Sequence, residues 1–176
     1  MKIHNVLDYF KQITTFVFDV DGVLTDGSLV ILPNGVMARN MNTKDGFALQ
    51  LAIKKGYNII IISGGSSPEV EYRLNTLGIT NVYMKAENKL SILQQHLLKN
   101  NLSASNVLFM GDDIPDIEAM KNVHLATCPC DATQDVLAIS EYVSPFPGGR
   151  GCVRDVIEKV MKLQGNWASD TNTQSI

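Results

Sequence analysis

A short apolar run that ends in two carboxylates constrains the fold of this chain more than any other feature. Residues 15–18 predict a buried strand, and Asp19 and Asp21 follow it directly, with Gly22 in the turn. Residues two positions apart in an extended segment point the same way, so both carboxylates face the same space. Like charges this close repel each other, and burying either one unpaired is costly. A metal ion, a shared proton or a solvated turn relieves the repulsion. The first option suggests an Asp nucleophile, with a second Asp as acid and base, acting on a metal-bound phosphate.

Apolar runs and helical patterns alternate along the chain from residue 15 to about residue 163. The apolar runs predict strands at residues 15–18, 57–62, 82–84, 107–110 and 124–127. The helical patterns predict helices near residues 47–56, 67–78, 88–99, 116–121 and 153–163. Asn34-Gly35, between the runs 28–32 and 36–41, is typical of a β-hairpin. Strands that alternate with helices predict an α/β fold with a doubly wound parallel sheet, Rossmann-like in type.

Polar side chains follow three of these strands at the point where each strand ends. They are Asp19, Asp21, Ser63 and Asp112. In open parallel sheets, ligands bind beyond the carboxyl ends of the strands. We therefore expect these side chains to converge on one rim of the sheet.

A second acidic cluster follows the strand at residues 107–110 and comprises Asp112, Asp113 and Asp116. One acidic pair after a strand is equally consistent with an ordinary turn, because Asp and Gly are common turn formers. Two such clusters at neighbouring strand ends favour a metal site. Mg²⁺ prefers oxygen ligands, often one or two carboxylates with phosphate oxygens and waters, and Asp19 and Asp112 could supply the carboxylates.

Length and composition indicate a single globular domain. The chain has 176 residues, of which 45% are hydrophobic, enough to bury a sizeable core. We expect the domain to span residues 1–163, with the hairpin at about 28–41. Residues 164–176 are polar and predict a flexible tail.

Charge and cysteine content argue against several classes of partner. A net charge of −3 provides no bulk attraction to nucleic acid or to an anionic membrane, so local cations must bind any anionic substrate. The longest aliphatic run, residues 59–62, is too short to span a bilayer, and charged residues near the N-terminus do not fit a signal peptide. The three cysteines lack the spacing of zinc or thioredoxin-like sites, and we expect reduced thiols in a cytoplasmic protein.

Four segments together resemble the motifs of the haloacid dehalogenase superfamily, in the same order along the chain. They are Asp19-Val-Asp21-Gly-Val, Ser63 at a strand end, Lys89, and Gly111-Asp112-Asp113-Ile-Pro-Asp116. Within that superfamily the chain resembles the 3-deoxy-D-manno-octulosonate 8-phosphate (KDO 8-phosphate) phosphatases, which lack a cap domain and act in lipopolysaccharide precursor synthesis. Further matching segments are Asn42-Thr-Lys-Asp45-Gly, Asn88-Lys89-Leu and Gly148-Gly-Arg150-Gly.

The resemblance implies a role for each motif residue. Asp19 is expected to attack phosphorus and form an aspartyl-phosphate, and Asp21 to protonate the leaving oxygen and then activate water. The carboxylates of Asp19 and Asp112, with the backbone carbonyl of Asp21, are expected to bind Mg²⁺. Ser63 and Lys89 are expected to hold phosphate oxygens. The remaining expected roles are orientation of the site by Asp113 and Asp116, and substrate binding by Asn42, Asp45, Gly64 and Arg150.

One departure from the family pattern concerns the substrate. The family usually has an Arg after the glycines that follow the strand-end hydroxyl, whereas this chain reads Ser63-Gly64-Gly65-Ser66-Ser67. A phosphatase for another acidic sugar phosphate, such as 2-keto-3-deoxy-nononate 9-phosphate, is therefore an alternative, as is a non-catalytic binding subunit. That nononate family has an acidic residue where this chain has Arg150, which favours the octulosonate.

The chain has no room for a cap domain between Asp19 and Ser63, because the hairpin, one helix and one strand fill that stretch. Members of the resembled family are homotetramers in which hairpins pack together and a neighbouring subunit covers each site. The apolar residues 29–32 are consistent with burial at such an interface. Alternatively, the hairpin folds onto its own domain.

Overall fold

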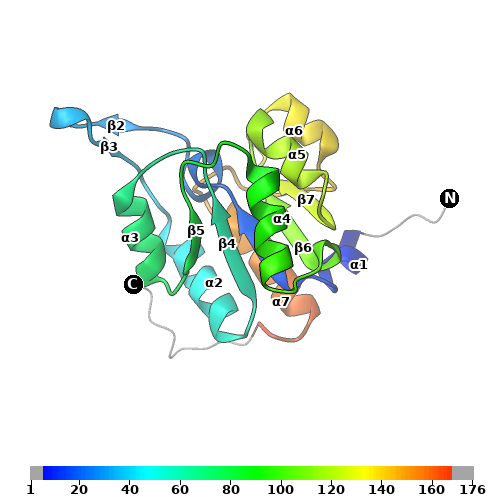
Figure 1. The fold of residues 1–176 in the computed structure, drawn as a ribbon. Helices are drawn as coiled ribbons and strands as arrows, with labels where there is room; N and C mark the ends of the chain where they lie inside the picture. Colours follow the sequence, from blue (N-terminus) through cyan, green and yellow to red (C-terminus); the bar gives the residue numbers. More distant parts are fainter. Residues whose placement is uncertain (1–5, 168–176) are drawn as a thin grey trace.

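The computed structural model describes residues 6–167. A six-stranded sheet forms its centre, with strand order β5-β4-β1-β6-β7-β8 and all neighbouring strands parallel (Figure 1). The strands are β1 (Thr15–Phe18), β4 (Asn58–Ile62), β5 (Asn81–Tyr83), β6 (Val107–Met110), β7 (Leu125–Cys128) and β8 (Tyr142–Val143). The predicted doubly wound α/β fold is confirmed.

Helices cover both faces of the sheet (Figure 1). One face packs against α1 (Val6–Phe10), α2 (Thr43–Lys54), α3 (Pro68–Thr76) and α7 (Cys152–Leu163). The other face packs against α4 (Lys89–Lys99), α5 (Ile117–Met120) and α6 (Gln134–Ile139). Side chains of β1 alternate between the two layers: Phe16 and Phe18 join the first and Val17 joins the second. Because both faces are covered, this strand is apolar throughout.

The path of the chain creates a switch point beside β1. From β1 the chain adds β4 and then β5 on one side, and it later adds β6, β7 and β8 on the other. Connections therefore leave the carboxyl ends of β1, β4 and β6 in different directions, which opens a crevice there. The rim predicted from the sequence lies at this crevice.

The predicted hairpin forms and projects from the body of the molecule (Figure 1). Its strands, β2 (Val30–Ile31) and β3 (Met37–Ala38), are shorter than predicted, and a 3₁₀ turn at Pro33–Gly35 joins them. A single antiparallel bridge between Thr25 and Met41 anchors its base. Its large apolar residues are between 42% and 74% exposed, with Ile31 the most exposed of them.

Three short elements, α1, α6 and β8, form without having been predicted. Each is six residues or fewer, so its hydrophobic periodicity is too short to identify, and each depends on packing against neighbouring elements.

The first residues of the predicted tail pack against the domain. The Gln164 side chain donates to the carbonyls of Phe10 and Ile13, and Trp167 lies beside Phe47. The packed part of the chain thus extends to residue 167, and the rest of the predicted tail lies outside the described residues. The division into one domain at residues 1–163 stays a prediction. Within residues 6–167, no helix has the length and apolar character needed to cross a membrane.

Candidate active site

A cleft of about 320 Å³ lies at the carboxyl ends of β1, β4 and β6. The structure brings together the motif residues there, as predicted. Its lining includes Asp19, Asp21, Ser63, Gly64, Lys89, Asp112, Asp113 and Asp116. These residues come from four separate parts of the sequence, so the cleft is a product of the parallel sheet and not of any one loop.

Asp19 is buried at the end of β1, and both of its carboxylate oxygens are engaged. Oδ1 accepts a hydrogen bond from the backbone N–H of Val20 at 2.6 Å. Oδ2 lies 2.9 Å from the ammonium of Lys89, the first residue of α4. This fixed orientation leaves the carboxylate at the floor of the cleft, ready to face a ligand.

Lys89 links the two acidic clusters. Its Nζ lies 2.7 Å from Oδ1 of Asp116 as well as 2.9 Å from Asp19, and its side chain is 5% exposed. Opposing effects act on its pKa: burial lowers it, but the two carboxylates raise it, and the net shift is upward. Lys89 is therefore a permanently charged cation held against the predicted nucleophile.

Asp113 and Asp116 orient the loop after β6. Asp116 Oδ2 accepts from the backbone N–H groups of Asp112 and Asp113 at 3.2 and 3.4 Å, and Asp113 caps the turn at Ile114–Asp116. Asp116 is fully buried with both oxygens occupied by hydrogen bonds. Asp112, by contrast, has a buried Oδ1 with no hydrogen-bond partner.

Electrostatics at the cleft favour a bound cation. Burial, then the neighbouring carboxylates, raise the pKa of Asp112 to about 7, and burial with the charge of Asp116 raises the pKa of Asp19 to about 6, despite the opposing effect of Lys89. Carboxylate oxygens of Asp19, Asp112 and Asp116 lie within 4.8 Å of one another. The unpartnered Asp112 oxygen and the repulsion between these groups fit a divalent cation with oxygen ligands. Asp112, which has an unpartnered oxygen, and Asp19, which is less buried than the fully covered Asp116, are the fitting ligands.

Two glycines allow the close approaches that build the cleft. A Cβ on Gly22 would lie 2.0 Å from Oδ2 of Asp112, and φ at this residue is +85°. A Cβ on Gly148 would lie 2.0 Å from the carbonyl oxygen of Gly22. The Gly148-Gly149 segment therefore packs directly behind the turn that follows Asp19.

Arg39, which follows β3, is a functional candidate that sequence reasoning missed. Its Nε and Nη2 donate to the two carboxylate oxygens of Asp21 at 2.6 and 3.0 Å, a bidentate ion pair. The pair raises the pKa of the guanidinium. No spacing or motif marks an isolated Arg at the end of a hairpin strand, so the sequence carried no signal for it.

Ser63 and Gly64 occupy the rim position expected of them. Ser63 is 1% exposed, and its Oγ accepts a hydrogen bond from the backbone N–H of Gly65. Both Ser63 and the two following glycines line the cleft. The loop contributes a hydroxyl and backbone groups but no cationic side chain.

Asp45, which was expected to bind substrate, lies outside the lining of the cleft, and substrate binding by it stays a prediction. Asp45 is 1% exposed, and its Oδ1 accepts from the backbone N–H of Arg154 at 2.7 Å, with a further hydrogen bond from Gly151. The carboxylate therefore caps the N-terminus of α7 from the first turn of α2. Burial raises its pKa to about 6.

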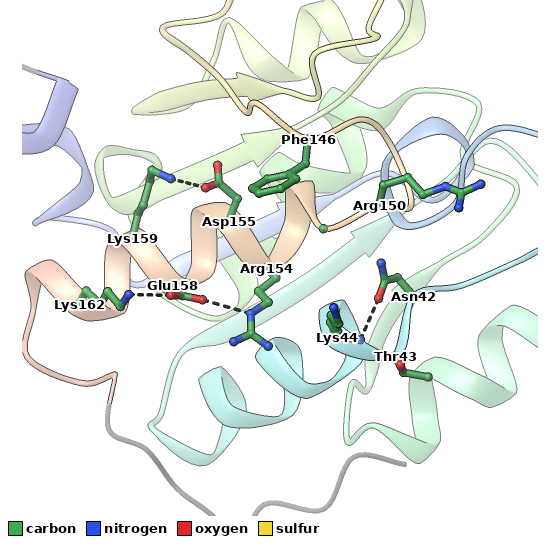
Figure 2. Close-up of a pocket in the computed structure, with 11 residues that line it drawn as sticks. Asn42, Thr43, Lys44, Phe146, Arg150, Arg154, Asp155, Glu158, Lys159 and Lys162 are labelled. Atoms are coloured by element: carbon green, nitrogen blue, oxygen red, sulfur yellow. Dashed lines mark hydrogen bonds and ion pairs between the residues drawn. The ribbon is translucent and has the colours of Figure 1, made fainter.

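Asn42 and Arg150 lie outside the cleft, beside a second cavity of about 610 Å³ next to α7 (Figure 2). Asn42 caps α2 through Lys44 N–H and donates to the carbonyl of Gly149. Arg150 is 67% exposed, pairs with Asp26 at 3.3 Å and points away from Arg154 in Figure 2. Within this subunit neither side chain reaches the cleft, so substrate binding by either one stays a prediction.

Comparison with known proteins provides an independent test of this arrangement. No protein-family model matches the chain. The 3-deoxy-D-manno-octulosonate 8-phosphate phosphatase KdsC of Escherichia coli K12 is 34% identical over 161 residues, which cover 92% of this chain and 86% of that protein. The same enzyme from Yersinia pestis is 31% identical, and its crystal structure covers 92% of this chain and 87% of its own with a TM-score of 0.89.

A third relative carries ligands. The 3-deoxy-D-manno-octulosonate 8-phosphate phosphatase of Moraxella catarrhalis was solved in complex with magnesium, phosphate and KDO. It is 31% identical, covers 92% of each chain and has a TM-score of 0.88. With sequence identity and fold in agreement, this chain belongs to the 3-deoxy-D-manno-octulosonate 8-phosphate phosphatase family of the haloacid dehalogenase superfamily.

Proposed function

We propose that this protein is a Mg²⁺-dependent phosphomonoester hydrolase that converts KDO 8-phosphate to KDO and phosphate. The observation that carries the proposal is the pair of carboxylates at the cleft, with buried Asp19 against the ammonium of Lys89 and half-buried Asp112 with an unpartnered Oδ1. The relative from Moraxella catarrhalis, which binds magnesium, phosphate and KDO, supports the same metal and substrate.

The geometry supports a two-step mechanism. Asp19 attacks phosphorus, the bond from phosphorus to the sugar oxygen breaks, and Asp21 donates a proton to that oxygen. Asp21 then accepts a proton from a water molecule that attacks the aspartyl-phosphate, which releases phosphate and restores Asp19. When bound, Mg²⁺ supplies positive charge that stabilises the phosphoryl oxygens as charge develops on them.

Lys89 and Ser63 position the reacting groups in this proposal. The buried Lys89 ammonium orients Asp19 and balances part of the charge of a phosphate dianion. The Ser63 hydroxyl is free to donate its proton to a phosphoryl oxygen, because in the structure Oγ accepts from Gly65. Asp113 and Asp116 hold the loop that carries Asp112.

A phosphate-release screen tests the function. The protein is incubated with a panel of sugar phosphates and Mg²⁺, and released phosphate is measured. We expect KDO 8-phosphate to have the highest kcat/KM. A clear preference for another acidic sugar phosphate overturns the substrate, and no hydrolysis of any phosphomonoester overturns the enzymatic function in favour of a binding subunit.

We also propose that the protein assembles as a homotetramer through its hairpin. The exposed apolar side chains of β2 and β3 support this, because a projecting patch of this kind is costly in water. Aspartate at both Val30 and Ile31 should dissociate the assembly, since buried unpaired carboxylates are expensive. Sedimentation measures the result, and a monomeric wild type with full activity contradicts the proposal.

The state of the cysteines bears on the cellular location of the protein. The three cysteines are free, with Cys128 and Cys152 buried and Cys130 exposed, which fits a reducing compartment. We place the protein in the cytoplasm, where the KDO it releases serves lipopolysaccharide precursor synthesis. Fractionation of cells followed by immunoblotting tests this location.

A further inference from the structure

The cleft has more negative than positive charge for the substrate that it is proposed to bind. Its lining contains five carboxylates, Asp19, Asp21, Asp112, Asp113 and Asp116. Among the described residues that line it, Lys89 is the only cation, and that ammonium is already held between two of the carboxylates. A sugar acid phosphate adds the charge of a phosphate and of a carboxylate. The proposed Mg²⁺ would offset only part of this charge, because five carboxylates outnumber the three positive charges of Lys89 and the ion. We therefore expect a further protein cation on the side where the sugar lies.

Two other arginines near α7 do not reach that position in the described subunit. Arg150 is mostly exposed and pairs with Asp26. Arg154 stacks on Phe47 and Trp167 and pairs with Glu158. Neither lines the cleft. Arg39 does not line the cleft either, but it is ion-paired with the lining residue Asp21, whereas these two arginines pair with residues outside the lining.

Arg39 lies at the border of the cleft: it lines a neighbouring cavity of about 310 Å³, and its side chain is 6% exposed. Its guanidinium donates two hydrogen bonds to Asp21, the residue that is proposed to protonate the leaving oxygen. The guanidinium therefore borders the proposed position of the leaving group. Its Nη2 lies only 3.4 Å from where a Cβ on Gly65 would be, which places it over the loop that lacks a cationic side chain. The anchor between Thr25 and Met41 holds the base of the hairpin that carries it.

The hydrogen bonds of Arg39 leave donors available for a ligand. Nε and one N–H of Nη2 bind Asp21, and one N–H of Nη1 binds the carbonyl of Met37 at 3.0 Å. A guanidinium has five N–H donors, so one remains on each terminal nitrogen. A planar fork of this kind suits a carboxylate.

We propose that Arg39 is a specificity residue, whose guanidinium contacts the carboxylate of the sugar acid while it holds Asp21 beside the leaving oxygen. The proposal rests on the proposed function, since it assigns the recognition of the sugar acid at that same site. It also explains how a chain without an Arg after Gly65 binds an acidic sugar.

A comparison of two substrates tests the proposal. KDO 8-phosphate contains the carboxylate, and p-nitrophenyl phosphate does not. Arg39→Ala should lower kcat/KM for KDO 8-phosphate at least about tenfold more than for p-nitrophenyl phosphate, with the excess loss in KM. Arg39→Lys keeps the charge but not the fork, and it should lie between the wild type and Arg39→Ala. Lys11→Ala, which removes an exposed ion-paired cation in the turn before β1, is the matched control.

A measurement of inhibition by free KDO distinguishes carboxylate recognition by Arg39 from a role of Arg39 that is limited to holding Asp21. Free KDO should inhibit hydrolysis of p-nitrophenyl phosphate by the wild type, and Arg39→Ala should raise its inhibition constant about tenfold. Equal losses on both substrates with an unchanged inhibition constant overturn the proposal. Circular dichroism and thermal unfolding establish whether each variant is folded. If Arg39→Ala does not fold, the same kinetic and inhibition measurements on Arg39→Lys test the proposal.

Measurements on the wild-type protein distinguish a failure of the role proposed for Arg39 from a failure of the proposed phosphatase function. If another acidic sugar phosphate is preferred, KDO 8-phosphate is the wrong substrate, and the same ratios measured on the preferred ester support or overturn the role of Arg39. If the wild type does not distinguish acidic from neutral sugar phosphates, carboxylate recognition by Arg39 is overturned while the phosphatase function stands.

Discussion

Two regions of this molecule hold buried or half-buried carboxylates with raised pKa values, and they differ in what surrounds them. In the cleft, Asp19 and Asp112 lie close to other carboxylates, and an oxygen of Asp112 has no partner. At the junction of α2 and α7, Asp45 faces backbone N–H groups at the start of a helix. Burial alone therefore does not identify a catalytic carboxylate.

The surroundings explain the difference in role. The partial positive charge at the start of α7 and its free N–H groups satisfy one Asp45 oxygen within the protein itself. Within residues 6–167, no group forms a hydrogen bond with Oδ1 of Asp112, a residue that lines the cleft beside Asp19. Asp45 Oδ2 is buried without a hydrogen-bond partner, as Asp112 Oδ1 is, so an unpartnered oxygen does not distinguish the two regions. The difference is that Asp112 has carboxylate neighbours at a cleft, where a ligand can relieve their repulsion.

The largest expected effect comes from the proposed nucleophile. Asp19→Asn should reduce turnover by at least about three orders of magnitude, because the amide has the same shape but is a very poor nucleophile. Phosphate release with Mg²⁺ measures turnover, and circular dichroism checks the fold. Turnover within tenfold of the wild type, with a normal spectrum, rules out Asp19 as the nucleophile.

The second largest effect is expected from removal of the metal, which should affect the cleft but not the junction of α2 and α7. Excess chelator should abolish activity and Mg²⁺ should restore it, and Asp112→Asn should weaken metal binding measured by calorimetry. Full activity in chelator, after dialysis, contradicts the metal proposal. Asp45→Asn is the matched control, because it changes a buried carboxylate that lies outside the cleft, and its Mg²⁺ affinity should equal that of the wild type.

Stability without metal should depend on pH in a predictable direction. The pKa of Asp112 is raised to about 7 from its ordinary 3.8, so between about pH 4 and 7 the folded state holds a proton that the unfolded state has lost. Stability of the metal-free protein should therefore fall as pH rises through that window. Urea denaturation at several pH values measures the effect. Mg²⁺ should remove most of this decrease in stability with pH. If the stability of Asp112→Asn decreases with pH as steeply as that of the wild type, Asp112 is not the cause.

The smallest expected effect on activity, with a clear effect on stability, comes from Asp45. Asp45→Ala should lower the free energy of unfolding by about 1 to 3 kcal/mol, because it removes the cap of α7 and leaves backbone donors buried without a partner. The value of kcat/KM for p-nitrophenyl phosphate should change less than about threefold. Urea denaturation and initial rates measure the two quantities, and a large loss of activity at unchanged stability would return Asp45 to the active site.

Local patterns predicted most of the fold and the centre of the site. The apolar run of β4 and the Ser67-Pro68 start of α3 carry their information within a few residues, and both elements formed where predicted. The strand-end aspartates converged because parallel strands bring their carboxyl ends together. By contrast, the short elements α6 and β8 lacked enough periodicity to be predicted.

By itself, the sequence determined the α/β class, the rim and the identities of the groups at the ends of β1, β4 and β6, because strand periodicity and turn chemistry are local. Only the tertiary structure decided which neighbours each carboxylate has. Asp21 meets an arginine 18 residues away, and Asp45 meets the start of a helix 109 residues away. Contacts at such separations depend on how whole elements pack, and no local pattern encodes them.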